Sequence, residues 1–218
     1  MLIWAAWVAW RREMKKREMG ILLCVIALGL AAATSANAGL TVFRPTPNDL
    51  SELPHAEYFT WGINFTLPSN EKITGAVLTF TNIWDWVKES DDHLFIHLLD
   101  NPKAGVTSYV DNQGGGDNFA GQGKLVSNWS DTEGGKARNF NLVLDFGKLG
   151  LLDALNAYIA TIPGKGKANF GFGIDPDCHF YNDGVTFAIT TEIPVIHAPE
   201  PVTIAILGIG GLLLRRRK

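Results

Sequence analysis

The sequence predicts an all-β fold, a single antiparallel β-sandwich of jelly-roll type with one short helix. Large apolar residues alternate with small or polar residues in several separate segments, the pattern of strands that bury one face. Loops rich in Gly, Asn, Asp and Pro separate these segments. Helical segments do not alternate with the strands, so a doubly wound parallel sheet with a nucleotide crevice is not expected.

The clearest alternation spans residues 59–67, where the large apolar residues stand at every second position. Alternation returns in residues 140–146, 170–174 and 185–189, and less regular β-rich runs occupy residues 73–83, 94–99 and 124–129. Each run has the length of an ordinary strand or slightly more. We therefore expect seven or more strands.

One segment has the period of a helix instead. Leu151, Leu152, Leu155, Tyr158 and Ile159 fall on one helical face, and a proline follows at position 163. We expect a short helix that covers one end of the sandwich.

Residues 1–38 are predicted to form a secretory signal peptide. A basic segment, residues 15–17, precedes an apolar stretch, residues 21–33, and small residues follow. Ala36 and Ala38 are the small residues before the expected cleavage point, which leaves Gly39 as the first residue of the mature chain. Residues 1–13 are not required by such a signal, and Met14 is an alternative start.

The C-terminal residues 195–218 contain a short apolar stretch followed by a basic tail. A helix of the uncharged residues 202–214 is about 20 Å long against a hydrocarbon core of about 30 Å, which favours a transient span of the inner membrane. Consecutive cations are expected to stay on the cytoplasmic side. The tripeptide before this stretch and the basic tail after it are Pro199, Glu200 and Pro201, and Arg215, Arg216, Arg217 and Lys218.

This order of tripeptide, short helix and basic tail resembles the PEP-CTERM sorting signal of exported bacterial proteins. The resemblance implies an exosortase-type sorting protease as a partner, beside signal peptidase. It also implies export through the inner membrane of a Gram-negative-type bacterium to the periplasm, the outer surface or the extracellular matrix. Such a setting suggests a non-enzymatic role in the exopolysaccharide or biofilm matrix, while the resemblance does not extend to residues 39–194.

The exported part of the chain is acidic. Residues 39–198 contain 10 Lys and Arg against 19 Asp and Glu, a formal charge of −9, whereas the whole chain has −3. Repulsion from phosphates argues against nucleic acid as a partner. Cys178 is the only cysteine after the signal peptide, so no intramolecular disulfide is expected there. It is a buried small residue, a mixed-disulfide partner or a nucleophile.

An oxygen-rich loop is the first candidate site. No cofactor is firmly indicated, but a structural Ca²⁺ ion is an expectation, since hard cations prefer several oxygen ligands. The alternative is that these residues initiate turns by bonding their own backbone. The candidate ligands are Asp175, Asp177, Asn182 and Asp183.

A pair of tryptophans is the second candidate site. Trp84 and Trp86 flank Asp85 and share one face of an extended segment, an arrangement that suits stacking on sugar rings. The alternative is that both tryptophans close the core. Trp129 and Asp131 form a weaker version of the same pattern.

Enzymatic activity is not expected. No local signature of a nucleophile elbow or a zinc-protease helix occurs in the sequence. His93 and His97 lie in a segment with strand composition, where residues four apart are about 13 Å from each other at ~3.3 Å per residue, too far for one zinc ion. A secreted polysaccharide hydrolase remains a further hypothesis, beside a carbohydrate-binding module.

Overall fold

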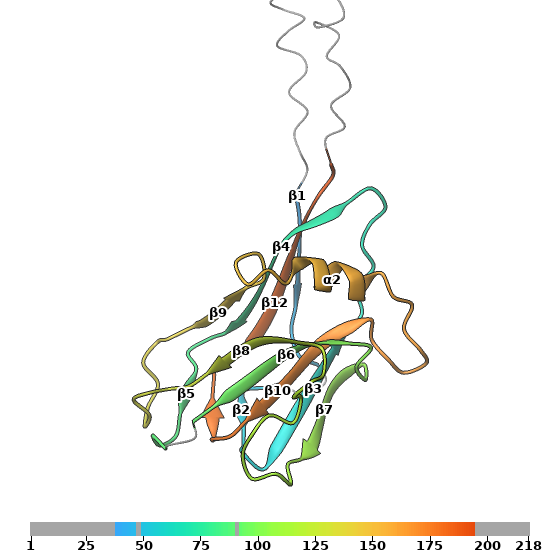
Figure 1. The fold of residues 1–218 in the computed structure, drawn as a ribbon. Coiled ribbons are helices and arrows are strands. Elements are labelled where there is room, and N and C mark those ends of the chain that lie inside the picture. Colours follow the sequence, from blue (N-terminus) through green and yellow to red (C-terminus); the bar gives the residue numbers. More distant parts are fainter. Residues whose placement is uncertain (1–37, 47–48, 90–91, 195–218) are drawn as a thin grey trace, which may run out of the picture. The chain divides into compact units, whose positions relative to one another are not determined.

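The computed structural model describes residues 38–46, 49–89 and 92–194. These residues contain twelve strands in three antiparallel sheets and one helix (Figure 1). The four-stranded sheet has the order β1 (Ala38–Phe43), β12 (Val185–Glu192), β4 (Lys72–Phe80) and β9 (Leu142–Asp145). The five-stranded sheet has the order β7 (Gly105–Val110), β3 (Glu57–Ile63), β10 (Phe170–Pro176), β6 (Leu94–Asp100) and β8 (Lys124–Trp129). The small sheet has the order β2 (Glu52–Leu53), β11 (Phe180–Tyr181) and β5 (Trp84–Asp85).

The two larger sheets share one core, and Phe187 of β12 lies at its centre. The Phe187 ring centroid is 4.9 Å from that of Phe172 and 5.7 Å from that of Phe170, both in β10 of the other sheet. Phe146, just after β9, adds a third ring at 5.4 Å. The large apolar residues that alternate in the sequences of β10 and β12 therefore form the inward faces of these strands.

The helix α2 (Leu152–Ile159) buries Leu155 and Ile159. It contacts β4 of the four-stranded sheet and β10 and β6 of the five-stranded sheet, so it covers one end of the core (Figure 1). The helix packs in this way because the helical spacing of its apolar residues places both buried residues on one face. The prediction of a mostly β chain with one short helix is confirmed.

Two differences from the expected strands have clear physical reasons. β3 ends at Ile63, and Phe65 leaves the strand to pack against Phe43 with ring centroids 5.8 Å apart. The alternation in residues 59–67 therefore continues past the strand, because the following apolar residues still reach the core. The pattern did not predict β1, whose residues are mostly exposed, or β7, which lies at the edge of its sheet.

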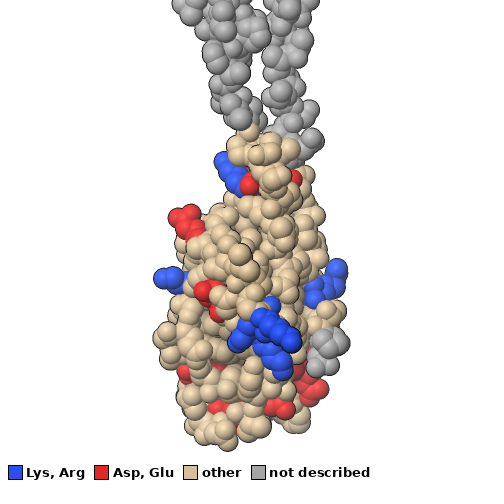
Figure 2. Space-filling model, turned by 90° about the vertical axis from the view of Figure 1, so that its right-hand side faces the viewer, with Lys and Arg blue, Asp and Glu red and all other residues tan. Residues whose placement is uncertain are grey.

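Charged side chains of both signs lie on the protein surface. Figure 2 shows a group of Lys and Arg side chains near the middle of one face and Asp and Glu side chains at several places around it. This face therefore has no uniform charge.

Several predictions on targeting fall outside the described residues. No described helix is both long and apolar enough to cross a bilayer. Ala36 and the whole of residues 195–218, with the tripeptide, the apolar stretch and the basic tail, lie outside this part of the chain. Ala38 and Gly39 lie in β1, where they pair with Glu192 and Thr191.

Candidate functional site

The pairing of β5 with β11 places aromatic side chains on the outer face of the small sheet. Trp84 lies opposite Tyr181, and Asp85 lies opposite Phe180. Asp85 and Phe180 are fully buried, so they define the inward face. Since successive side chains of a strand point to opposite faces, Trp84 and Tyr181 point outward. The backbone N–H of Trp86 donates to the carbonyl of His179 at 3.0 Å, which extends the pairing by one step.

Four rings form a continuous row on this outer face, which we call the aromatic row: Trp84, Tyr181, His179 and Trp86. Trp84 and Tyr181 have centroids 4.9 Å apart and planes 26° apart, and Tyr181 and His179 have centroids 4.7 Å apart at 18°. Trp86 ends the row, 6.0 Å from His179 at 28°. Trp84 is half-buried, whereas Trp86 is 57% exposed. The ring of Trp86 is therefore the one most available to a ligand.

A carboxylate lies beside the aromatic row. Glu52 of β2 is the neighbour of Tyr181 across the strands, and its Oε1 is 2.9 Å from Nε2 of His179. Its side chain is 60% exposed. An exposed aromatic ring next to polar hydrogen-bonding groups suits sugars, because sugar C–H groups pack on the ring and sugar hydroxyls bond to the polar groups.

Asp85 does not take part in this surface. It lies between the two tryptophans in the sequence, but its side chain is 0% exposed and points to the opposite face. The structure therefore keeps Trp84 and Trp86 together and removes Asp85 from the set of residues that a surface ligand can touch.

A cavity of about 420 Å³ contains the second aromatic and acidic pair, Trp129 and Asp131. The Trp129 ring stacks on Phe140, with centroids 5.8 Å apart at 11°. Arg138 is 3.1 Å from a carboxylate oxygen of Asp131 and also pairs with Glu133. Both acids are thus already bound to a cation of the chain, which makes this cavity a weaker candidate for a sugar site than the aromatic row.

The expected calcium ligands bind protein groups at separate places. Asp175, fully buried in β10, accepts hydrogen bonds from the backbone N–H of Asn118 at 2.6 Å and from its side chain at 3.3 Å. Asp177 accepts from the backbone N–H of Gly116 at 3.0 Å. These two carboxylates therefore anchor the loop of residues 111–123 to the outer face of the five-stranded sheet.

The other two expected ligands shape the connection between β11 and β12. Asn182 donates to the carbonyl of Leu50 at 2.6 Å and accepts from the backbone N–H of Gly184 at 2.9 Å. Asp183 accepts from the side chain of Asn82 at 2.9 Å. Only the bond from Gly184 to Asn182 is the local backbone bond of the alternative turn interpretation, whereas the other two bonds join distant segments. Among the described residues, the three acids of the expected calcium site do not form a group that could hold a metal ion.

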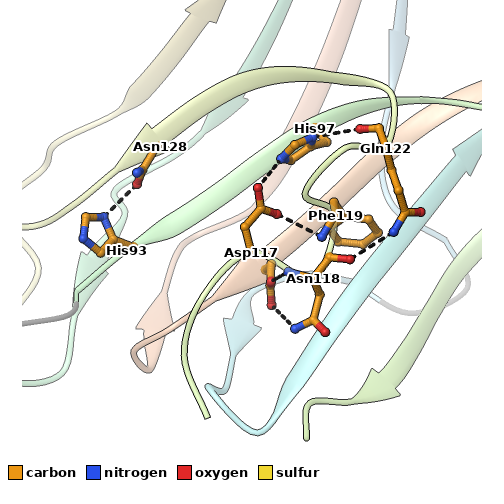
Figure 3. Close-up of polar contacts among 8 residues, drawn as sticks. His93, His97, Asp117, Asn118, Phe119, Gln122 and Asn128 are labelled. Atoms are coloured by element: carbon orange, nitrogen blue, oxygen red, sulfur yellow. Dashed lines mark hydrogen bonds and ion pairs between the residues drawn. The ribbon is translucent and has the colours of Figure 1, made fainter. Parts of the chain in front are cut away.

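Sequence reasoning missed a buried histidine and aspartate pair beneath the same loop (Figure 3). His97 of β6 is 4% exposed, and its Nε2 is 2.8 Å from Oδ2 of Asp117, while its Nδ1 is 3.0 Å from the carbonyl of Gln122. His93 instead contacts Asn128 at 2.7 Å, so the two histidines do not share a site. The interaction fixes the loop and leaves no open position for a ligand at His97.

The loop also explains a glycine in β10. A Cβ atom at Gly173 would lie 2.8 Å from the ring of Phe119, which packs over this position. The ring of Phe119 also lies 6.0 Å from that of His97. Gly171 and Gly173, which lie on the outward face of β10, are the signal in the sequence that could have indicated a segment covering this face.

Burial raises the pKa of Asp175 from 3.8 to about 6, against the lowering effect of its bonds to Asn118, and the nearby Asp111 and Asp177 charges raise it further. The folded state thus binds the proton more tightly than the unfolded state, so this residue's contribution to stability is complete below about pH 4 and is lost as the pH rises through about 6. At about 1.4 kcal/mol per pKa unit, the loss is at most about 3 kcal/mol.

We expect Asp175→Asn to remove this part of the pH dependence. Urea unfolding of the wild type and the variant between pH 4 and 7 measures it, with the exposed Asp153→Asn as control. Wild type and Asp175→Asn should differ in the slope of the unfolding free energy against pH. Equal slopes would mean that Asp175 keeps its ordinary pKa.

The comparisons with known proteins give no family for this chain. No protein-family model matches it, and no curated protein matches it significantly.

Proposed function

We propose that this chain is an exported, non-enzymatic surface or matrix protein that binds polysaccharide through its aromatic row. The observation that carries the proposal is the continuous stack of four rings that ends in the exposed Trp86. A soluble domain gains little by exposing a large indole ring, whereas a sugar ring can cover it and remove both apolar surfaces from water. We further propose that the two larger sheets form a β-sandwich of jelly-roll type that supports this surface.

The proposed location follows from the two ends of the sequence. Signal peptidase cleaves after Ala38, the residues from Pro199 to Lys218 direct the chain to an exosortase-type protease, and the mature protein works in the exopolysaccharide layer or biofilm. This part of the proposal is supported by the order of tripeptide, apolar stretch and basic tail in the sequence.

The charge of the domain favours a neutral polysaccharide. Residues 39–198 have a formal charge of −9, and one of their acids, the exposed Glu52, lies beside the row. A polyanionic glycan would be repelled by both, most strongly at low salt. Stacking on Trp86 together with hydrogen bonds to Glu52 needs no charge on the sugar.

Binding without hydrolysis fits the positions of the acids at the row. Glycoside hydrolysis requires two carboxylates about 5–9.5 Å apart on either side of the scissile bond. Asp85 lies on the opposite face of the small sheet and is 0% exposed, so a glycan on the row meets Glu52 but not Asp85. A hydrolase is the second candidate function, and it predicts turnover.

Retention of the purified full chain on immobilised polysaccharides tests the proposal. We expect retention on at least one neutral polysaccharide, little change in retention when salt is raised, and no release of reducing ends. Retention on polyanions alone, with loss at high salt, would contradict stacking as the cause. Release of reducing ends would favour the hydrolase, and no retention on any polymer would remove the glycan proposal.

A further inference from the structure

A group of three buried side chains lies on the inward side of the small sheet. Asp85 of β5, Asp92 just before β6, and Cys178 between β10 and β11 are 0%, 4% and 4% exposed. One oxygen or sulfur atom from each residue lies within 4.8 Å of the corresponding atoms of the other two. Segments far apart in the sequence therefore bring three potential metal ligands to one point in the core.

Asp85 is the unusual member of this group. Both of its carboxylate oxygens are buried, and neither has a partner of ordinary hydrogen-bond geometry among the described residues, because the Val87 backbone and the Asp92 carboxyl group interact with it only more weakly. Buried carboxylates in stable proteins are nearly always hydrogen-bonded or bound to a cation, because an isolated buried charge is costly. Burial, and after it the neighbouring acids Asp92 and Asp131, raise the pKa of Asp85. Its surroundings thus require either a proton or a cation.

The other two members, Asp92 and Cys178, are placed where they could bind a metal ion together with Asp85. Asp92 accepts the backbone N–H of Glu89 through both of its oxygens, at 2.9 and 2.8 Å, which fixes its carboxylate. Sγ of Cys178 is 3.7 Å from the carbonyl oxygen of Val87. Cys178 is 4% exposed, and a thiol buried in this way is ordinarily neutral. A divalent metal removes that proton, since metal ligation stabilises the thiolate.

We propose that Asp85, Asp92 and Cys178 form a structural Zn²⁺ site beneath the aromatic row. Two carboxylates and a thiolate suit zinc, whereas calcium and magnesium prefer oxygen ligands alone. Zinc bonds of about 2.0–2.2 Å to oxygen and about 2.3 Å to sulfur separate neighbouring ligand atoms by roughly 3.3–3.8 Å in a tetrahedral site. Small side-chain adjustments bring the three residues to such distances, and a water molecule or the Val87 carbonyl completes the set.

The metal would join three segments of the chain. It connects β5 to Asp92, which lies just before β6, and to the segment that leads into β11. Trp84 of β5 and Trp86 just after it stand on the other face of the small sheet, and His179 and Tyr181 follow Cys178 in the sequence. The site therefore holds together the two strands that carry the aromatic row. The proposal does not depend on glycan binding, because its test measures the metal.

Metal content and cobalt spectroscopy test the site on the purified full chain. After incubation with zinc and removal of free metal, we expect about one zinc ion per wild-type chain. Cobalt substitution should give a thiolate-to-cobalt absorption band in the near ultraviolet. Cys178→Ser should remove this band, whereas the exposed control Asp183→Asn should retain both zinc and band. Equal zinc contents in wild type and Cys178→Ser, or no thiolate band in wild type, would overturn the proposal.

A variant could also fail to bind metal because it is unstable. Thermal melting with zinc and with chelator distinguishes that case from the loss of a metal ligand. With zinc at about 100 times its Kd, wild type should melt roughly 5–10 °C higher than in chelator, and Asp85→Asn should not respond. In chelator, Asp85→Asn should melt at or above the temperature of wild type, because it removes an unpaired buried carboxyl group. A lower melting temperature of Asp85→Asn in chelator, without a zinc response of wild type, would show that Asp85 shares a proton with Asp92 instead.

Discussion

Replacing Phe187 with alanine is expected to lower the free energy of unfolding by about 3–5 kcal/mol. Phe187 is 0% exposed, and its ring contacts Phe170 and Phe172 of the facing sheet as well as Phe146. The substitution leaves a cavity between the two larger sheets, which interlocking rings on both sides cannot easily fill. For a domain whose stability is typically about 5–15 kcal/mol, this is a large fraction of the total.

Urea unfolding of the full chain, followed by circular dichroism, measures the effect of Phe187→Ala. Leu40→Ala is the matched control, because Leu40 lies in β1 of the same sheet and is 69% exposed. We expect the control to change the free energy of unfolding by less than about 0.5 kcal/mol. A change below about 1 kcal/mol for Phe187→Ala would contradict the shared core of the two larger sheets.

The second large effect is expected on binding. Trp86→Ala should weaken the affinity for the retained polysaccharide at least tenfold, equivalent to about 1.4 kcal/mol, because it removes the exposed end of the aromatic row. Its effect on stability should be small, since the side chain is 57% exposed. Affinity electrophoresis in gels that contain the polysaccharide measures the change, with urea unfolding as the check on the fold.

Trp84→Ala provides the contrast. Trp84 is half-buried and stacked on Tyr181 at 4.9 Å, so we expect this variant to lose about 1–2 kcal/mol of stability and only part of its affinity. The exposed Ile162→Ala should affect neither property. If Trp84→Ala weakened binding more than Trp86→Ala without loss of stability, the contact surface would be at the other end of the row.

The strands were predictable where one face of a strand is buried. In β12 buried and half-buried residues alternate. All of β10 is buried, but its large apolar residues still alternate with smaller or polar ones, so the hydrophobic pattern indicates both strands. β1 has no continuous buried face, because it lies at the edge of its sheet, so its sequence carries no such pattern. The short strands β2, β5 and β11 have two residues each, too few for any periodicity.

The site was predictable only in part. Trp84 and Trp86 are adjacent in the sequence pattern, but their stacking partners Tyr181 and His179 come from a distant segment. Only the pairing of β5 with β11 brings them together. Asp175 shows the same limit, because its oxygens resemble metal ligands in the sequence, whereas the N–H groups that bind them belong to a distant loop. Cys178 is buried, as the simplest of its three interpretations expected, but its acidic neighbours were not foreseeable.

Nuclear magnetic resonance of the tryptophan indole N–H groups tests the central claim most directly. An oligosaccharide from the retained polysaccharide is titrated into the isotope-labelled full chain, and the Trp86 signal is assigned by its loss in Trp86→Ala. We predict that the Trp86 signal shifts most and that the signal of Trp61, which is 2% exposed, stays fixed. A saturable shift confined to Trp129, or no shift of Trp86 at saturating ligand, would contradict binding at the aromatic row.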